Sequence, residues 1–136
     1  EEEVLRRHRE GALSQSITDR LAAVLTPADV AEATREAEKV RVDDGILSYL
    51  TAIARASRRS PDLALGASPR ASIAVLRGAR IRALMDGRDF VIPDDVKALV
   101  LPAYRHRVAL RPEAEIQGVT ADDAVARVLT RVEVPR

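Results

Sequence analysis

The sequence lacks cysteine, tryptophan and asparagine, and has only three aromatic residues. Without cysteine, disulfide bonds and thiolate metal sites are excluded. Tyr49, Phe90 and Tyr104 are too few for a platform on which nucleic-acid bases could stack. No apolar run approaches the roughly 20 residues that a membrane span needs, and the acidic residues 1–3 are unlike the start of a signal peptide. We therefore expect a cytoplasmic protein that makes no membrane contact.

Positive and negative charges nearly cancel, so the formal net charge is only +1. Lysine supplies just two of the 22 basic residues, Lys39 and Lys97, and arginine supplies the rest. This bias looks like genomic base composition, so an arginine alone does not indicate a phosphate. With 136 residues, 46% of them hydrophobic, the chain can bury a real core. We expect one domain over residues 1–136.

Helix start signals recur along the chain. Caps followed by proline or acidic residues predict helices that begin near Pro27, Asp43 or Asp44, Pro69, Pro93 and Thr120. The third of these should end at Gly87, a residue suited to a left-handed cap. Helical spacing of apolar residues predicts the following inward-facing side chains: Val30, Ala33, Ala37, Ile46, Tyr49, Leu50, Ile53, Ile73, Leu76, Ala79, Ala83, Leu84, Val96, Leu99, Val100, Ala103, Val125, Val128, Leu129 and Val132.

The other segments are less regular. Residues 1–9 have the pattern of a helix already under way, so we expect the chain to be part of a longer one. Residues 11–25 receive no assignment, and residues 60–66 are expected to be a loop. Residues 107–110 alternate and stop before a proline, which predicts a short strand. The expected fold is mainly α, a compact bundle of about five helices with at most a short β-element.

The most informative segment is Leu-Gly-Ala-Ser-Pro-Arg-Ala at residues 65–71. Ser68 is a favoured N-cap residue and Pro69 suits the first helical position. Gly66 and Ala67 allow the backbone to approach a partner closely. Arg70 then falls in the first helical turn, although this end of the helix dipole favours anions by about 0.3–1 kcal/mol. The pattern indicates a bound anion at Arg70; the alternative is pairing with a nearby carboxylate.

Catalytic patterns are missing from the sequence. It contains no phosphate-binding glycine loop, and neither His8 nor His106 belongs to a cluster with metal-ligand spacing. We expect both histidines to have packing or capping roles, and no metal site. The acidic pairs at residues 43–44, 94–95 and 122–123 all fall at helix starts, where capping explains them. The chain therefore has no visible catalytic machinery of its own.

Four motifs in this order resemble the C-terminal lid domain of MoxR-type AAA+ ATPases. They are residues 65–71, Gly-Arg-Asp-Phe-Val-Ile-Pro-Asp-Asp-Val at 87–96, His-Arg-Val-Ala-Leu at 106–110 with Pro-Glu-Ala-Glu at 112–115, and Val-Glu-Val-Pro-Arg at 132–136. The resemblance spans nearly the whole chain. One departure is Ser57, where we expect threonine in this family; the hydroxyl is kept.

The resemblance implies that Arg70 is the sensor-2 arginine, the one catalytic residue of this chain, which reaches the γ-phosphate of ATP. It also implies a nucleotide-contacting segment made of Gly66, Ala67, Ser68, Pro69 and Arg70. The rest of the ATP and Mg²⁺ site would lie on the large AAA+ domain of the intact protein. We therefore expect no tightly bound cofactor and no ATPase activity in this chain alone, but ATP hydrolysis by the parent protein.

The same resemblance implies the partners. They are the large AAA+ domain of the same chain, further copies in a ring that is typically a hexamer, and proteins with von Willebrand A domains that the ATPase remodels or activates. The alternatives are a helical nucleic-acid-binding module, which would use Arg70, Arg77, Arg80 and Arg88, or a protein-interaction module. The low net charge and scarce aromatics weigh against nucleic acid.

Overall fold

A computed structural model describes residues 1–9 and 21–135, without the side chain of Arg7. Its elements are, in chain order, α1 (Glu2–Arg9), α2 (Pro27–Lys39), α3 (Asp44–Arg58), β1 (Leu63–Leu65), α4 (Pro69–Met85), α5 (Pro93–Tyr104), β2 (Ala109–Leu110), α6 (Pro112–Ile116) and α7 (Ala121–Thr130). The mainly helical fold with a minor β-element is confirmed. The described residues contain two more helices than the five expected, one of them the short α6.

Internal contacts divide the chain into two compact units, residues 1–32 and 33–136. The single domain expected over residues 1–136 stays a prediction. The first unit holds α1 and the start of α2, where Thr26 and Asp29 form a reciprocal cap: the N–H of Thr26 donates to Oδ2 of Asp29 at 2.7 Å, and the N–H of Asp29 donates to Oγ1 of Thr26 at 3.2 Å. Of residues 11–25, those up to residue 20 lie outside the described part, and residues 21–25 form no helix or strand.

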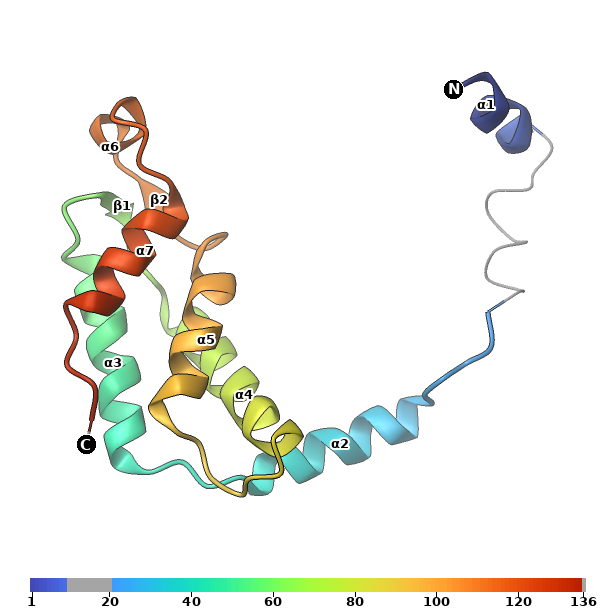
Figure 1. Ribbon diagram of the computed structural model, residues 1–136, viewed down its shortest axis with the longest axis horizontal. Helices are drawn as coiled ribbons and strands as arrows, with labels where there is room; N and C mark the ends of the chain where they lie inside the picture. The colour runs from blue at the N-terminus through green and yellow to red at the C-terminus, as the bar shows by residue number, and fades with distance from the viewer. Residues whose placement is uncertain (10–20, 136) are drawn as a thin grey trace. The chain divides into compact units, whose positions relative to one another are not determined.

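The second unit contains the core (Figure 1). Helices α3, α4, α5 and α7 pack together, and their fully buried side chains include Ile53, Val75, Val96, Val100 and Val125. The inward faces predicted for α3, α5 and α7 are confirmed, with Leu99, Ala103, Leu129 and Val132 only partly buried.

The predicted inward face of α4 is wrong in part. Ile73 is 52% exposed and Leu84 is 38% exposed, whereas Ala71, Val75, Ala79 and Ala83 are buried. Leu76 is only partly buried. Apolar residues occur on several sides of α4, so their spacing along the sequence does not identify the buried face. Three of the four buried residues are alanines, and α5 packs closely against this helix: a Cβ on Gly78 would lie 2.5 Å from Cδ1 of Leu99.

The face predicted for α2 is also wrong in part. Only Ala37 of the three predicted residues is buried; Val30 is 55% exposed and Ala33 is exposed as well. Helical spacing shows that a segment can form a helix, but burial of a given face also requires a neighbour on that side.

Gly87 ends α4 as predicted, with a φ of +73°. Its N–H donates to the carbonyl of Leu84 at 3.0 Å, and the N–H of Arg88 donates to that of Ala83 at 2.9 Å, which together make a Schellman cap. The chain can therefore reverse its direction between α4 and α5. These two helices lie side by side in Figure 1.

The β-element is a two-stranded antiparallel sheet. It pairs Leu63 with Leu110 and Leu65 with Ala109, with an irregular register between the two pairs. The strand predicted at residues 107–110 is confirmed in its last two residues. The loop predicted before Gly66 is wrong for residues 63–65, which form β1. Within residues 1–9 and 21–135, no helix combines the length and the apolar character that a membrane span requires.

Candidate functional site at the start of α4

The segment that leads into α4 is fastened to the end of α3. The buried hydroxyl of Ser57 donates to the carbonyl of Ala54 at 2.8 Å and accepts from the N–H of Ala67 at 2.9 Å. A Cβ on Gly66 would lie 2.5 Å from the backbone nitrogen of Arg58. The close approach expected at Gly66 and Ala67 is therefore made to α3 of the same unit, and Ala67 is buried.

Helix α4 begins as its sequence predicts. Ser68 is the N-cap, with an extended backbone, and its side chain accepts from the N–H of Ala71 at 3.4 Å. Pro69 occupies the first helical position, where its missing N–H costs nothing. Ser68, Pro69 and Arg70 are all exposed. The last three residues of the predicted site thus form its open part, and Gly66 and Ala67 form its support.

Arg70 lies in the first turn of α4 with its side chain exposed. This turn contains no acidic residue, and among the described residues the guanidinium has no carboxylate partner. Pairing with a nearby carboxylate, the alternative raised by the sequence, does not occur in this part of the chain. Within the described residues, a cation without a carboxylate partner therefore lies at the positive end of a helix.

The end of α5 lies against the same turn of α4. The hydroxyl groups of Ser72 and Tyr104 are 3.3 Å apart, and Tyr104 is fully buried. Burial raises the pKa of Tyr104, although the hydrogen bond to Ser72 and the charge of Arg58 act in the opposite direction. Tyr104 therefore stays neutral at ordinary pH and serves as an anchor. This contact between α4 and α5 has no signal in the local sequence.

Just beyond α5, Arg107 donates to the carbonyl of Arg70 at 3.4 Å and to Nε2 of His106 at 3.1 Å. His106 and His8 are exposed, so neither packs in the core, and the capping role that the sequence also allows for them stays a prediction. His106 instead accepts a hydrogen bond from its neighbour. No group of three or more His, Asp or Glu residues that could hold a metal occurs in the part of the chain that the structure describes.

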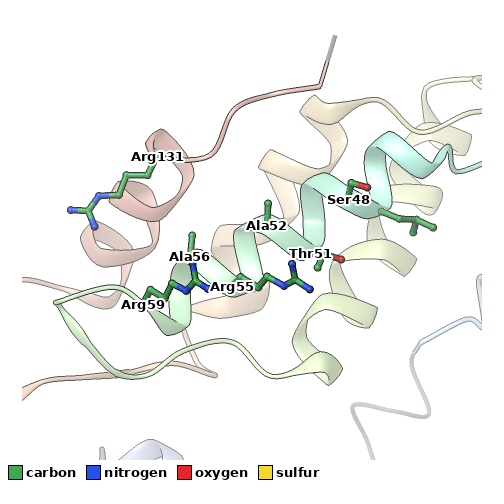
Figure 2. A pocket seen from close by; sticks show the side chains of 8 residues that line it. Ser48, Thr51, Ala52, Arg55, Ala56, Arg59 and Arg131 are labelled. Carbon is green, nitrogen blue, oxygen red and sulfur yellow. The ribbon is translucent and has the colours of Figure 1, made fainter.

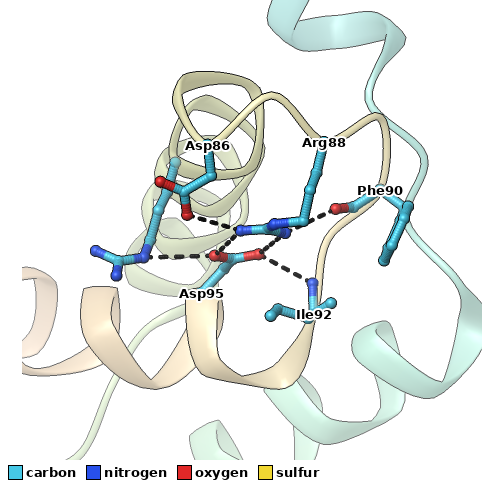
Figure 3. Close-up of polar contacts among 6 residues, drawn as sticks. Asp86, Arg88, Phe90, Ile92 and Asp95 are labelled. Carbon is cyan, nitrogen blue, oxygen red and sulfur yellow. Dashed lines mark hydrogen bonds and ion pairs between the residues drawn. The ribbon is translucent and has the colours of Figure 1, made fainter.

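A buried ion pair closes the opposite end of α4 (Figure 3). Two nitrogens of Arg88 donate to the two carboxylate oxygens of Asp95, each at 2.8 Å, and one of them also donates to Asp86 at 2.9 Å. The N–H of Ile92 donates to Asp95 at 3.0 Å, and Nε of Arg82 lies 3.4 Å from it. Asp95 was expected only to cap α5; it also joins α4 to α5.

The electrostatics of Asp95 follow from these contacts. Burial raises the pKa of its carboxyl, but the hydrogen bonds from Arg88 and from the N–H of Ile92, together with the charges of Arg88 and Arg82, outweigh burial and lower it overall. The same pairing raises the pKa of Arg88. Because this carboxylate is buried and fully engaged, its role is structural.

A separate groove of about 690 Å³ runs along α3 (Figure 2). Seven of its eight lining residues come from α3 or its C-cap, and Arg131 follows α7. It contains Arg55, Arg59 and Arg131 but no carboxylate. The groove shares no residue with the segment 66–70, so the open surface around Arg70 is a different region of the molecule.

Comparison with known proteins identifies relatives. A family model described as AAA lid domain matches residues 55–128, which include the whole segment 66–70. The chain is 39% identical over 115 residues to Uncharacterized protein YeaC of Bacillus subtilis, covering 85% of this chain and 36% of that protein. It is 31% identical over 122 residues to Chaperone MoxR1 of Mycobacterium tuberculosis, covering 83% of this chain and 32% of that protein.

One further relative and one solved structure extend the comparison. Protein MoxR of Methylorubrum extorquens is 37% identical over 71 residues, or 52% of this chain and 21% of that protein. The crystal structure of a candidate ATPase from Cytophaga hutchinsonii superposes with a TM-score of 0.79 over 98% of this chain and 43% of that one, at 24% identity, which shows a shared fold. The chain spans only about a third of the length of YeaC and MoxR1.

Proposed function

The chain belongs to the AAA lid domain family, and on that premise we propose that it is the nucleotide-sensing lid of a MoxR-type AAA+ ATPase, with Arg70 as its sensor-2 arginine. One observation carries the proposal. Arg70 is exposed in the first turn of α4, and no carboxylate in the described residues neutralises it. A cation in this position is best satisfied by an anion supplied by another part of the intact protein.

The residues present fit a triphosphate. Ser68 satisfies one N–H of the first turn of α4, and the guanidinium of Arg70 can offer a planar pair of donors to phosphate oxygens. Gly66 and Ala67 hold this turn on α3 and so determine where Arg70 stands. Bound ATP would supply the charged terminal phosphate, which is lost on hydrolysis. Arg70 would then tie the lid to the nucleotide-binding domain only while that phosphate is present.

The lid would act as a rigid body in this scheme. The buried core shared by α3, α4, α5 and α7, together with the pair Arg88–Asp95, keeps Arg70 in a constant position relative to the rest of the unit. Differential contact in two nucleotide states is the physical basis of such hinge motion. Loss of the contact at Arg70 would release the whole unit rather than one side chain.

The remaining parts of the proposal concern the intact protein. They are ATP hydrolysis with Mg²⁺ on a large AAA+ domain, assembly into a ring that is typically a hexamer in this family, remodelling or activation of proteins with von Willebrand A domains, and a cytoplasmic location. The support is the relationship to MoxR proteins, one of which is named a chaperone. This chain by itself is expected to hydrolyse no ATP, because it lacks a phosphate-binding loop.

The decisive experiment compares two arginine variants of the intact protein. Arg70→Ala should lower the rate of ATP hydrolysis by about tenfold or more, since phosphate-contacting arginines contribute up to about 10³–10⁵ in related phosphoryl transfers. Arg77→Ala removes another exposed positive charge two turns further along α4 and should leave the rate within about twofold. Wild-type turnover in the Arg70→Ala protein would remove Arg70 from the mechanism.

A further inference from the structure

A second arginine stands at the first turn of α4. Arg107 lies in the loop between α5 and β2, 37 residues from Arg70 in sequence, yet one of its terminal nitrogens donates to the carbonyl of Arg70 at 3.4 Å. Its Nε donates to Nε2 of His106 at 3.1 Å. The tertiary fold therefore brings two guanidinium-bearing residues to one helix start.

The backbone around Arg107 is held firmly. The N–H groups of Arg107 and Val108 both donate to the carbonyl of Tyr104, at 2.7 Å and 3.1 Å. Tyr104 is itself fully buried, and its hydroxyl meets that of Ser72 at 3.3 Å, two residues after Arg70 on α4. The loop is thus anchored to the turn that carries Arg70, and Arg107 is placed there by the core.

Arg107 keeps donors available for a ligand. A guanidinium has five N–H groups, and the two contacts above use two of them. Arg105, two residues earlier, pairs with Asp122 at 2.9 Å, whereas no carboxylate in the described ranges pairs with Arg107. Through its contact with the backbone carbonyl of Arg70, Arg107 brings a second positive charge beside the first turn of α4, the positive end of the helix dipole. A multiply charged anion at this turn would be attracted by both arginines and by the helix end.

We propose that Arg107 is a second phosphate-contacting residue, which with Arg70 forms a two-arginine site for the terminal phosphate of ATP. The inference rests on the proposed function, because that function supplies the nucleotide. Arg107 then adds to the preference of the lid for a triphosphate over a diphosphate. Its partial burial and its hydrogen bond to Arg70 keep it oriented before the nucleotide arrives.

The test uses the intact protein and measures the dissociation constants of a non-hydrolysable ATP analogue and of ADP by calorimetry. Arg107→Gln retains an N–H donor for the carbonyl of Arg70 but removes the charge, and Arg107→Ala removes both. Both variants should bind the ATP analogue about tenfold more weakly, as expected for a lost charge-assisted hydrogen bond. ADP binding should change less than about twofold. Arg111→Ala, which removes an exposed arginine four residues away, serves as the control.

The outcomes separate the two proposals. Unchanged affinity of Arg107→Gln for the ATP analogue would overturn the role of Arg107, because it would then only tether the start of α4. An equal loss of affinity for the ATP analogue and ADP would also overturn it, since the terminal phosphate would not be its target. If Arg70→Ala binds the ATP analogue normally, the proposed function itself fails, whatever the Arg107 variants do.

Discussion

The hydroxyl of Ser57 at the end of α3 accepts a hydrogen bond from the N–H of Ala67 at 2.9 Å, and both residues are buried. This bond joins α3 to the segment that carries Arg70. The position of Arg70 therefore depends on a serine 13 residues earlier in the chain.

Replacing Ser57 with alanine should destabilise the fold. The N–H of Ala67 would be left buried without a partner, which costs about 1–3 kcal/mol of unfolding free energy. Ser48→Ala, on the exposed side of the same helix, should change stability by less than about 0.5 kcal/mol. Urea denaturation followed by circular dichroism measures both. Equal stability of the two variants would show that the bond to Ala67 contributes nothing.

Adding a methyl group at Gly66 should also be destabilising. Its Cβ would lie 2.5 Å from the nitrogen and 2.6 Å from Cα of Arg58, and backbone atoms cannot move aside without shifting α3. Overpacking of this kind costs about 1–3 kcal/mol.

Gly45→Ala is the matched control for Gly66→Ala. The nearest atom to its new Cβ is the Cβ of Pro135, 3.8 Å away. In a helix, alanine is more stabilising than glycine by about 0.5–1 kcal/mol. The two variants should therefore shift the melting temperature in opposite directions. A Gly66→Ala protein as stable as the wild type would mean that α3 and the loop separate easily.

Replacing Asp95 with asparagine should remove the ion pair that joins α4 to α5. Breaking a fully buried pair costs about 3–5 kcal/mol; we expect about 2–3 kcal/mol because the side chain of Arg88 is 22% exposed. The adjacent Asp94→Asn breaks only the exposed pair with Lys97 and should cost less than about 1 kcal/mol. Guanidinium denaturation of the two variants distinguishes a buried from a surface carboxylate at neighbouring positions.

The contribution of Asp95 to the free energy of unfolding should also be lost in acid. Its pKa in the folded chain lies below the ordinary value of 3.8, so protonation favours the unfolded state. The stabilisation is present above that ordinary pKa and is lost as the pH falls through the lower folded value. The difference in unfolding free energy between wild type and Asp95→Asn should therefore narrow as the pH falls below about 5 and continue to narrow below 3.8.

Other carboxylates do not obscure this measurement. The pKa values of Asp29 and Asp123 are also lowered, mainly by hydrogen bonds from Thr26 and Thr120 in their capping boxes. Both titrate alike in the wild type and the variant, so their effects cancel in the difference. A difference that stays constant across the acid range would show that the charge of Asp95 is not what stabilises the pair.

Local signals in the sequence were sufficient to predict most of the helices and the exposed residues of the candidate site. Caps, prolines and Gly87 mark helix boundaries because they act through hydrogen bonds and backbone angles within a few residues. The same short-range physics places Ser68, Pro69 and Arg70 at the start of α4. Strand β1 and helix α6 were missed because both are short and carry weak periodic signals.

Tertiary structure alone decided which faces and which distant residues meet. Ala71 and Ile73 are both apolar residues of α4, but only the side that carries Ala71 and Val75 faces the neighbouring helices, so Ala71 is buried and Ile73 is exposed. Likewise, nothing near Arg70 in sequence indicates Arg107, Ser57 or Tyr104. The periodicity of apolar residues describes one helix at a time. Which residues are buried, and which arginines lie close together, depends on the elements that the folded chain packs against that helix.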